Sequence, residues 1–317
     1  MKSIKYILIV GLTLSAFTSC NSDDITAGNN AVAYGDLQKY EVEALVYDNE
    51  NDTRSAYDAT TNQLYWQEGD CIGVYEKNLY ECDSYVFRSS QQAFIPFAAQ
   101  TNISSSAAFA LYPEEYVYMP GWTTKGVKAI FQMPALYIYN ADSEDVTTVS
   151  GKTIYRGNLP MWGIASGEFG NISLNMKYLS GVMMVNLKGV KDKASYIKVS
   201  SEEMPLSGGL EIIIADKKGV VNNNCQIQEG TSSLTAKNYI IVDLRAIPNS
   251  DAVIYLPIVP AVYNDLTVSY TEGVLTYDDE KNLVESSIDN VVWKPIKTYA
   301  KGKQIKRGTG YKVNYQF

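Results

Sequence analysis

Apolar and polar residues alternate with a period of two in several stretches of this chain, whereas no long stretch has the helical period of 3.6. The closing segment shows the pattern well, because Tyr311 and Val313 alternate with Lys312 and Asn314. Continuous apolar runs, typical of strands buried on both faces, occupy residues 182–187, 210–215 and 252–259. The patterns predict an all-β protein of sandwich type, with alternating strands at residues 40–46, 127–133, 172–178, 266–270 and 311–317.

The length of the chain bears on the number of domains. The 317 residues, of which 46% are hydrophobic, are too many for one ordinary sandwich. We therefore expect two β-sandwich domains in tandem. The boundary is predicted at the charged segment 189–193, which follows a buried run. It separates an N-terminal domain over residues 37–188 from a C-terminal domain over residues 189–317.

The first twenty residues have the pattern of an export signal. Lys2 and Lys5 precede an apolar run over residues 7–16, which is too short to span a bilayer. Ser19 and Cys20 then resemble a lipobox, in which the cysteine is acylated and becomes the mature N-terminus. We expect residues 1–20 to be a lipoprotein signal peptide ending at a lipidated Cys20, followed by a flexible leash over residues 21–36. The alternative is an ordinary signal peptide, with Cys20 incidental.

Composition argues against several classes of function. The chain contains no histidine, which removes Ser-His-Asp and Cys-His catalysis and the commonest metal ligand. Its net charge of −8 disfavours binding to nucleic acid. The acidic clusters at residues 114–115, 202–203 and 278–280 stand beside turn residues or in polar loops, where solvated charge is common. We expect no enzymatic activity, no metal and no cofactor.

Two cysteines flank a predicted hairpin. Cys71 and Cys82 would face one another only if the turn fell at Glu76 and Lys77, whereas Lys77 and Asn78 make the better turn. A disulfide between them stays an open alternative. Neither cysteine is part of a CxxC motif, so a redox or metal-binding role is not expected.

An ordered series of motifs resembles the fimbrillin-like proteins of Bacteroidetes, over essentially the whole chain that follows the leash. Gly69 and Asp70 in the second motif also predict a tight turn. The motifs are TRSAY at residues 53–57, WQEGDCIGVY at 66–75, AFALYP at 108–113, PMWGIA at 160–165, YLPIVPA at 255–261 and GTGYKV at 308–313.

The resemblance implies two transthyretin-like or immunoglobulin-like sandwiches in a lipid-anchored protein of the outer membrane and fimbrium. Its partners would be other subunits of a type V pilus and a host or bacterial surface receptor. In such pilins a protease cuts after an arginine and removes the first strand, and a strand from the next subunit fills the groove. Here the arginine would be Arg54. The removable strand would present Tyr40, Val42, Ala44 and Val46 on one face.

Two departures from the family pattern favour a tip, anchor or accessory role over a main stalk role. Related proteins carry the signature around Arg54 whether or not they are cut, so the alternative for Arg54 is an uncut framework residue. We also expect no spare donor strand after the closing strand. A different class of function remains open, a surface glycan-binding lipoprotein of a nutrient-uptake system, with sugars stacked on Trp122, Trp162, Tyr116 or Tyr118.

Overall fold

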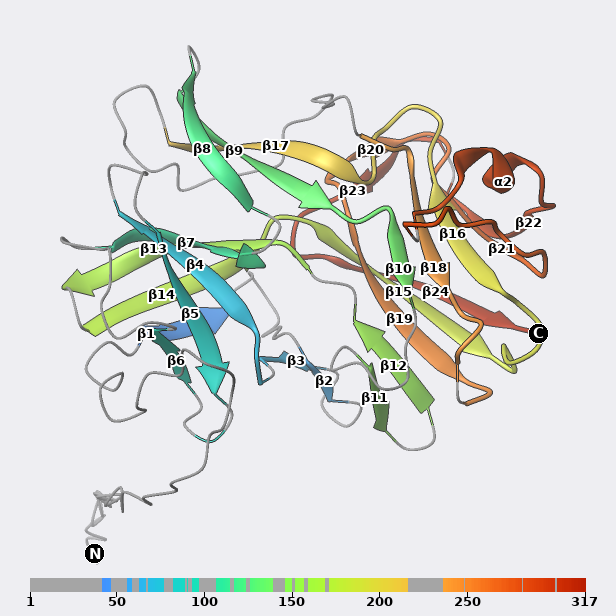
Figure 1. Ribbon diagram of the computed structural model, residues 1–317, viewed down its shortest axis with the longest axis horizontal. Helices are drawn as coiled ribbons and strands as arrows, with labels where there is room; N and C mark the ends of the chain where they lie inside the picture. Colours follow the sequence, from blue (N-terminus) through green and yellow to red (C-terminus); the bar gives the residue numbers. More distant parts are fainter. Residues whose placement is uncertain are drawn as a thin grey trace, which may run out of the picture.

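The described part of the chain is mostly β-strand with almost no helix (Figure 1), so the prediction of an all-β protein of sandwich type is confirmed. The structure is a computed structural model that describes residues 42–46, parts of 56–168, all of 171–215, and 236–317 except 248, 281 and 300. The one helix among these residues is the short α2, Glu285–Asp289. None of the helices in this part of the chain has the length and apolar character of a membrane span.

Seven strands of the N-terminal part form a closed barrel, which occupies the left side of Figure 1. The closure means that the hydrogen-bonded ladder runs around all seven strands without an open edge. Within the barrel, β4, β5, β7 and β13 pair with their neighbours in antiparallel fashion. In order around the barrel the strands are β1 Val42–Val46, β14 Asn171–Tyr178, β13 Met161–Glu168, β7 Ala107–Tyr112, β4 Cys71–Glu76, β5 Cys82–Arg88 and β6 Ala93–Pro96.

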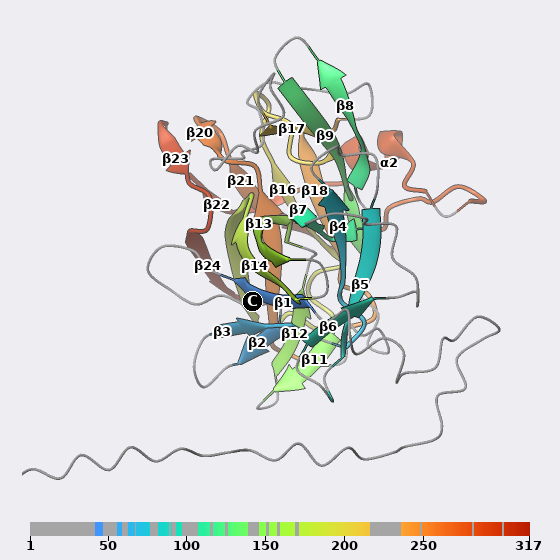
Figure 2. The same cartoon turned by 90° about the vertical axis from the view of Figure 1, so that its left-hand side faces the viewer.

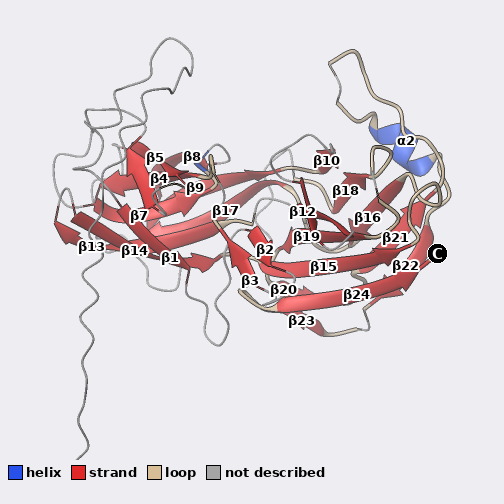
Figure 3. Ribbon diagram, turned by 90° about the horizontal axis from the view of Figure 1, so that it is seen from below, coloured by secondary structure: helices blue, strands red, loops and turns tan. Residues whose placement is uncertain are grey.

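Two five-stranded sheets form a sandwich in the C-terminal part (Figure 3). We call them the inner sheet and the outer sheet. The inner sheet has the order β11 Val146–Val149, β12 Lys152–Arg156, β19 Ala252–Ile258, β15 Gly181–Lys188 and β24 Gly310–Gln316. The outer sheet has the order β10 Leu136–Ile138, β18 Tyr239–Asp243, β16 Tyr196–Ser200, β21 Thr267–Thr271 and β22 Lys294–Thr298.

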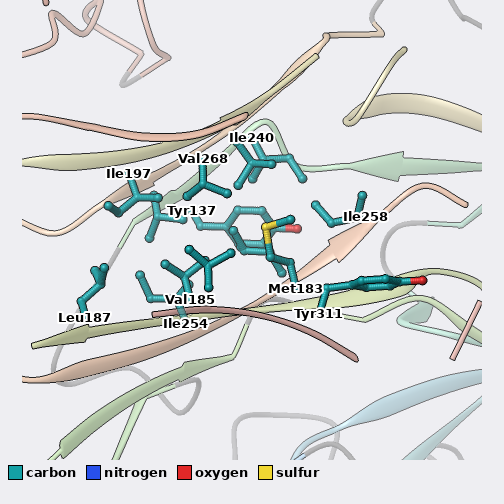
Figure 4. Packing of buried hydrophobic residues seen from close by; sticks show 14 of the residues in the cluster. Tyr137, Met183, Val185, Leu187, Ile197, Ile240, Ile254, Ile258, Val268 and Tyr311 are labelled. Atoms are coloured by element: carbon teal, nitrogen blue, oxygen red, sulfur yellow. The ribbon is translucent and has the colours of Figure 1, made fainter. Parts of the chain in front are cut away.

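The largest hydrophobic core lies between these two sheets. Figure 4 shows Met183, Val185 and Ile254 from the inner sheet close to side chains of the outer sheet. Ile240 and Val268 meet them from the outer sheet, and each of these five side chains is fully buried. Burying one such aliphatic side chain stabilises the fold by about 1.5 to 3 kcal/mol.

The central strands β15 and β19 of the inner sheet are buried on both faces, which explains their continuous apolar runs. Val185 lies opposite Ile254 in the antiparallel pairing of β15 and β19, and both face the outer sheet. Val182 and Tyr255, on the other face, belong instead to the hydrophobic cluster of the barrel. One sheet therefore serves two cores.

This arrangement bears on the predicted division of the chain at residues 188 and 189. β15 ends at Lys188, yet it lies between β19 and β24, which come after the division. β10, β11 and β12 likewise precede residue 189 and pair with β18 or β19. The sheets do not separate at that point, because the inner and outer sheets each combine strands from both sides of it.

The remaining strands form smaller sheets. A three-stranded sheet of β17, β9 and β8 includes the alternating segment predicted at residues 127–133, in which Ala129, Phe131 and Met133 are buried. Lys128 of β9 forms an ion pair with Glu211 of β17. The bounds are β8 Val117–Thr123, β9 Gly126–Met133, β17 Gly208–Ala215, and, in two-stranded sheets, β2 Ala56–Asp58 with β3 Gln63–Tyr65 and β20 Ala261–Tyr263 with β23 Lys303–Ile305.

The connection between β21 and β22, residues 272–293, covers the outward face of the outer sheet, and we call it the flap. Leu275 and Ile288 of the flap pack with Tyr196 and Ile241 of the sheet in a third hydrophobic cluster. Trp293 closes this cluster, because its indole Nε1–H donates a hydrogen bond to the carbonyl of Ile288 at 2.9 Å.

Candidate functional site: the strand that closes the barrel

β1 closes the barrel by pairing with two strands that come much later in the chain. It runs parallel to β14 over five residues, from Val42 opposite Ile172 to Val46 opposite Met176. On its other side it is antiparallel to β6, with Val42 opposite Phe94 as the one paired position. The ladder to β14 is therefore the main attachment of β1, and β6 contributes little.

The neighbours of β1 border an aromatic part of the barrel core. Phe94 and Met176, which lie opposite the two ends of β1, are both buried in this cluster. The ring of Trp66 meets Phe94 edge-on at 4.8 Å and Tyr112 at 5.2 Å. Such edge-to-face pairs contribute about 0.5 to 1.5 kcal/mol each beyond their burial. The core beside β1 is thus supported from strands other than β1.

The motif that contains Trp66 has a structural role. Gly69 has a φ of +87°, which glycine adopts without strain, and its N–H donates to the carbonyl of Phe87. The buried Asp70 carboxylate accepts a hydrogen bond from the Tyr112 hydroxyl at 2.9 Å. The predicted tight turn is confirmed, and its carboxylate holds the end of β7.

The predicted site residues fall partly inside and partly outside the described chain. Val42, Ala44 and Val46 lie in β1, whose bounds fall within the strand predicted at residues 40–46, and their common apolar face stays a prediction. Cys20, Tyr40 and Arg54 lie outside the described residues. The cleavage candidate Arg54 falls in the segment between the end of β1 at Val46 and the start of β2 at Ala56.

The two hairpin cysteines do not face one another. Cys71 lies opposite Val86 and Cys82 lies opposite Tyr75, four positions along the same ladder. The thiol of Cys71 donates a hydrogen bond to the Glu114 carboxylate at 3.1 Å, and the Ser84 hydroxyl donates to the same carboxylate at 2.6 Å. Glu114 therefore ties together the two strands of this hairpin.

The aromatic residues considered for sugar stacking are not all accessible. Trp162 in β13 is 1% exposed, so it cannot stack on a sugar. Trp122 lies in β8 opposite Val127, and Tyr118 lies in β8 opposite Ile130, whereas Tyr116 lies outside the described residues. Among the described residues, no group of three Cys, Asp or Glu side chains gathers in a geometry that could hold a metal ion.

One polar cluster was not anticipated from the sequence. The buried Asp243 carboxylate at the end of β18 accepts hydrogen bonds from the Arg245 guanidinium, the shortest at 2.6 Å, and from the Tyr277 hydroxyl at 3.0 Å. The guanidinium lies 5.2 Å from the Tyr196 ring and 5.3 Å from the Tyr277 ring. Burial, reinforced by the charge of Asp243, raises the pKa of Tyr277. The cluster fastens the flap to the outer sheet.

That cluster could not be recognised beforehand because Tyr277 is 34 residues from Asp243 in sequence. An aspartate two residues before an arginine is common in polar segments and does not by itself indicate a buried cluster. Tyr277 comes close to the pair only because the flap folds back over the outer sheet. The hydrogen bond of Arg245 to Asp243 raises the pKa of the guanidinium, which stays charged. We assign the cluster a structural role.

Comparison with known proteins gives structural likeness only. No family model matches the chain, and no curated protein matches it. A Bacteroides uniformis protein assigned to cell adhesion has a TM-score of 0.44 and 11% identity, with 88% of this chain and 92% of that chain covered. A Bacteroides ovatus protein with the same assignment has a TM-score of 0.43 and 11% identity, covering 87% and 91%. The fimbrial anchor protein Mfa2 from Porphyromonas gingivalis has a TM-score of 0.26 and 11% identity, covering 73% and 77%.

Proposed function

We propose that this protein is a surface-anchored structural or adhesive subunit of a type V pilus, in a tip, anchor or accessory position. The proposal rests on the ordered sequence motifs and on one observation about the fold. The N-terminal strand β1 completes the barrel by pairing with β14 and β6, which are formed by residues far from it in sequence. Because β1 is the first strand of the barrel, a single cut after it would allow it to be removed while the other six strands remain connected in one chain.

Removal of β1 would open the barrel along one strand position. β14 would lose the partner of residues 172–176, and β6 would lose the partner of Phe94. Unpaired strand edges are templates for another chain. A strand from a neighbouring subunit would fill the gap by strand addition, running parallel to β14 as β1 does.

A cut after Arg54 would release β1 together with the lipid anchor at Cys20. Arg54 precedes β2 by two residues, so the cut would leave the paired strands β2 and β3 intact. Several acyl chains on Cys20 would hold the uncut precursor firmly at the outer membrane, whereas one chain binds only marginally.

Limited digestion with an arginine-specific protease tests this function. We expect the full chain to acquire a new N-terminus at Ser55 and then to form assemblies larger than the precursor, as measured by N-terminal sequencing and light scattering. Arg54→Ala should block both events. Arg156→Ala, in the paired strand β12, is the matched control and should change neither. Cleavage at Arg54 that leaves a stable monomer would refute assembly by strand addition.

A further inference from the structure

Positive charge is concentrated at the end of an acidic chain. The protein contains 27 Lys and Arg against 35 Asp and Glu, yet residues 294–317 contain no Asp or Glu. The seven basic residues of this segment are Lys294, Lys297, Lys301, Lys303, Lys306, Arg307 and Lys312.

The fold brings this segment to one side of the sandwich. The segment forms β22, β23 and β24, of which β22 is the last strand of the outer sheet and β24 the last strand of the inner sheet. Lys294 forms an ion pair with Glu272 at 2.5 Å. The other lysines form no ion pair with a carboxylate in the part of the chain that the structure describes. We call these five the basic edge: Lys297, Lys301, Lys303, Lys306 and Lys312.

Two of these lysines are held over aromatic rings, which keeps their charge in a fixed place. The Lys303 ammonium lies 4.9 Å from the Tyr311 ring and 5.5 Å from the Tyr299 ring. The Lys297 ammonium lies 6.0 Å from the Tyr299 ring. The basic edge is therefore partly preorganised for an anionic partner.

Protection of the strand edges against aggregation explains only part of this charge. Pro295 and Lys297 in β22 do discourage another strand from pairing there. Lys301 and Lys306, however, lie outside β22, β23 and β24 and are exposed. These two lysines do not protect a strand edge from pairing. The basic edge is therefore better suited to electrostatic binding of an anionic partner than to pairing with another strand.

The flap carries a matching negative surface, which we call the acidic tip: Asp278, Asp279 and Glu280. All three residues are exposed. A bridge between Tyr277 and Leu283 closes the small hairpin, and the Asp278 carboxylate accepts hydrogen bonds from the N–H groups of Glu280 and Asn282. Lys281, which follows Glu280 in the sequence, lies outside the described residues. The bridge and the hydrogen bonds join the described residues on either side of it, on a flap that is anchored by its own hydrophobic cluster.

The acidic tip and the basic edge lie on opposite sides of the molecule. Figure 2 shows the loop that leads into α2 projecting on one side, with β22, β23 and β24 on the other, and Figure 3 shows the same separation. The two surfaces of one copy therefore cannot meet. Each also borders an exposed valine, Val274 at 67% in the flap and Val262 at 52% in β20, which pairs with β23.

We infer that the partner of the basic edge is the acidic tip of a second copy of this chain. The contact is head-to-tail, because it joins two different surfaces, and repetition of it gives open chains or rings. At physiological ionic strength the Debye length is about 8 Å, so repulsion between two copies of net charge −8 is screened while the direct contact persists. The contact does not require removal of β1.

Charge reversal in two variants gives a sharp test in the full chain carrying Cys20→Ala, which removes acylation. One variant has a positive tip, Asp279→Lys with Glu280→Lys, and the other has a negative edge, Lys301→Glu with Lys306→Glu. Each variant alone presents like charges at the contact, so each should lose self-association in sedimentation velocity. Mixed together they should associate again, because the positive tip of one fits the negative edge of the other.

The controls separate this contact from general charge effects. Lys188→Glu with Lys193→Glu, at exposed lysines outside the basic edge, should associate as the unaltered protein does. Salt at about 1 M, where the Debye length is about 3 Å, should dissociate the assemblies. A monomer at physiological ionic strength, association of either reversed variant as strong as that of the unaltered protein, or failure of the mixture to associate would each overturn the inference. Arg54→Ala leaves this contact intact, so failure of strand addition would be seen separately.

Discussion

Two glycines at adjacent positions of the inner sheet differ in what surrounds them. A Cβ at Gly181 would lie 2.6 Å from Cγ2 of Ile305, 3.0 Å from the carbonyl oxygen of Lys306 and 3.3 Å from the Tyr311 ring. Gly310, in the neighbouring strand opposite Val182, has no such atom within 4 Å. The difference arises because β23 and the turn after it pass directly over Gly181.

Substitution of these glycines should therefore have unequal effects on stability. We expect Gly181→Ala to lower the free energy of unfolding by about 1 to 3 kcal/mol, since overpacking a filled site forces neighbours to shift. Gly310→Ala should change it by less than about 1 kcal/mol. Urea unfolding followed by tyrosine fluorescence measures both. Equal losses for the two variants would contradict the packing described around Gly181.

Tyr239 is one of several buried tyrosines whose ionisation should destabilise the fold at alkaline pH. Burial, reinforced by the nearby Glu285 carboxylate, raises the pKa of Tyr239 from 10.0 to about 12. The folded state thus holds this proton more tightly than the unfolded state, so its contribution to stability is complete below about pH 10 and is lost as the pH rises towards 12. Tyr239→Phe should reduce the fall in unfolding free energy across this window. An unchanged fall would show that Tyr239 does not contribute to it.

The structural role of a single residue could be predicted from the sequence where it depends only on neighbouring residues in the chain. The turn at Gly69 and Asp70 follows from the residues themselves. The cluster of Asp243, Arg245 and Tyr277 does not, because it depends on where the flap folds back. The position of Trp162 within the PMWGIA motif favours a buried framework residue over a sugar-stacking one, and the side chain is buried.

At the scale of elements, periodicity predicted which segments are strands but not how they pair. The alternation over residues 311–317 corresponds to β24, in which Tyr311 and Val313 are buried and Lys312 and Asn314 exposed. Two of the three continuous runs lie in β15 and β19, which are buried on both faces. The third lies in β17, where Leu210 and Ile212 are buried and Glu211 and Ile213 only half-buried. Neither pattern indicates that β15 pairs with β24 in parallel. The alternation in a strand shows which of its side chains face the core, but not which strand lies beside it.

The position of β15 predicts how the chain tolerates division. A fragment over residues 189–317 lacks β15, the strand between β19 and β24, and also lacks β10, β11 and β12. We expect this fragment not to fold, because the core side chains Met183, Val185 and Leu187 are missing. A fragment over residues 130–317 retains them and should show more dispersed amide resonances. A well-folded fragment over residues 189–317 would contradict this expectation and would support the domain boundary predicted between residues 188 and 189.

At the scale of the molecule, composition and signal pattern predicted an exported β protein, and the fold agrees with the all-β part. The closure of the barrel by β1 was not predictable, because the pairing of residues 42–46 with 172–176 depends on the whole path between them. The sharing of the inner sheet by two cores was also missed, since the apolar runs indicate burial on both faces without saying what covers each face.

Attachment of the whole molecule to the membrane should depend on Cys20. We expect Cys20→Ala to move the protein from the membrane fraction to the soluble fraction or to leave the precursor unprocessed, since several acyl chains anchor far more firmly than one. Cys71→Ala is the matched control and should stay with the membrane. Equal incorporation of a palmitate analogue into the unaltered protein and Cys20→Ala would refute the anchor.

The parallel pairing of β15 with β24 also sets an order in time. Asn186 and Asn314, joined by a side-chain hydrogen bond, are 128 residues apart in sequence. A chain that emerges from a membrane with its N-terminus first cannot complete the inner sheet until its last strand has arrived. Closing so long a loop is slow, and the open sheet is exposed to aggregation meanwhile. In the export that we propose for this protein, transport and final folding would therefore be successive events, and the stable form would be reached only after the chain had crossed the membrane.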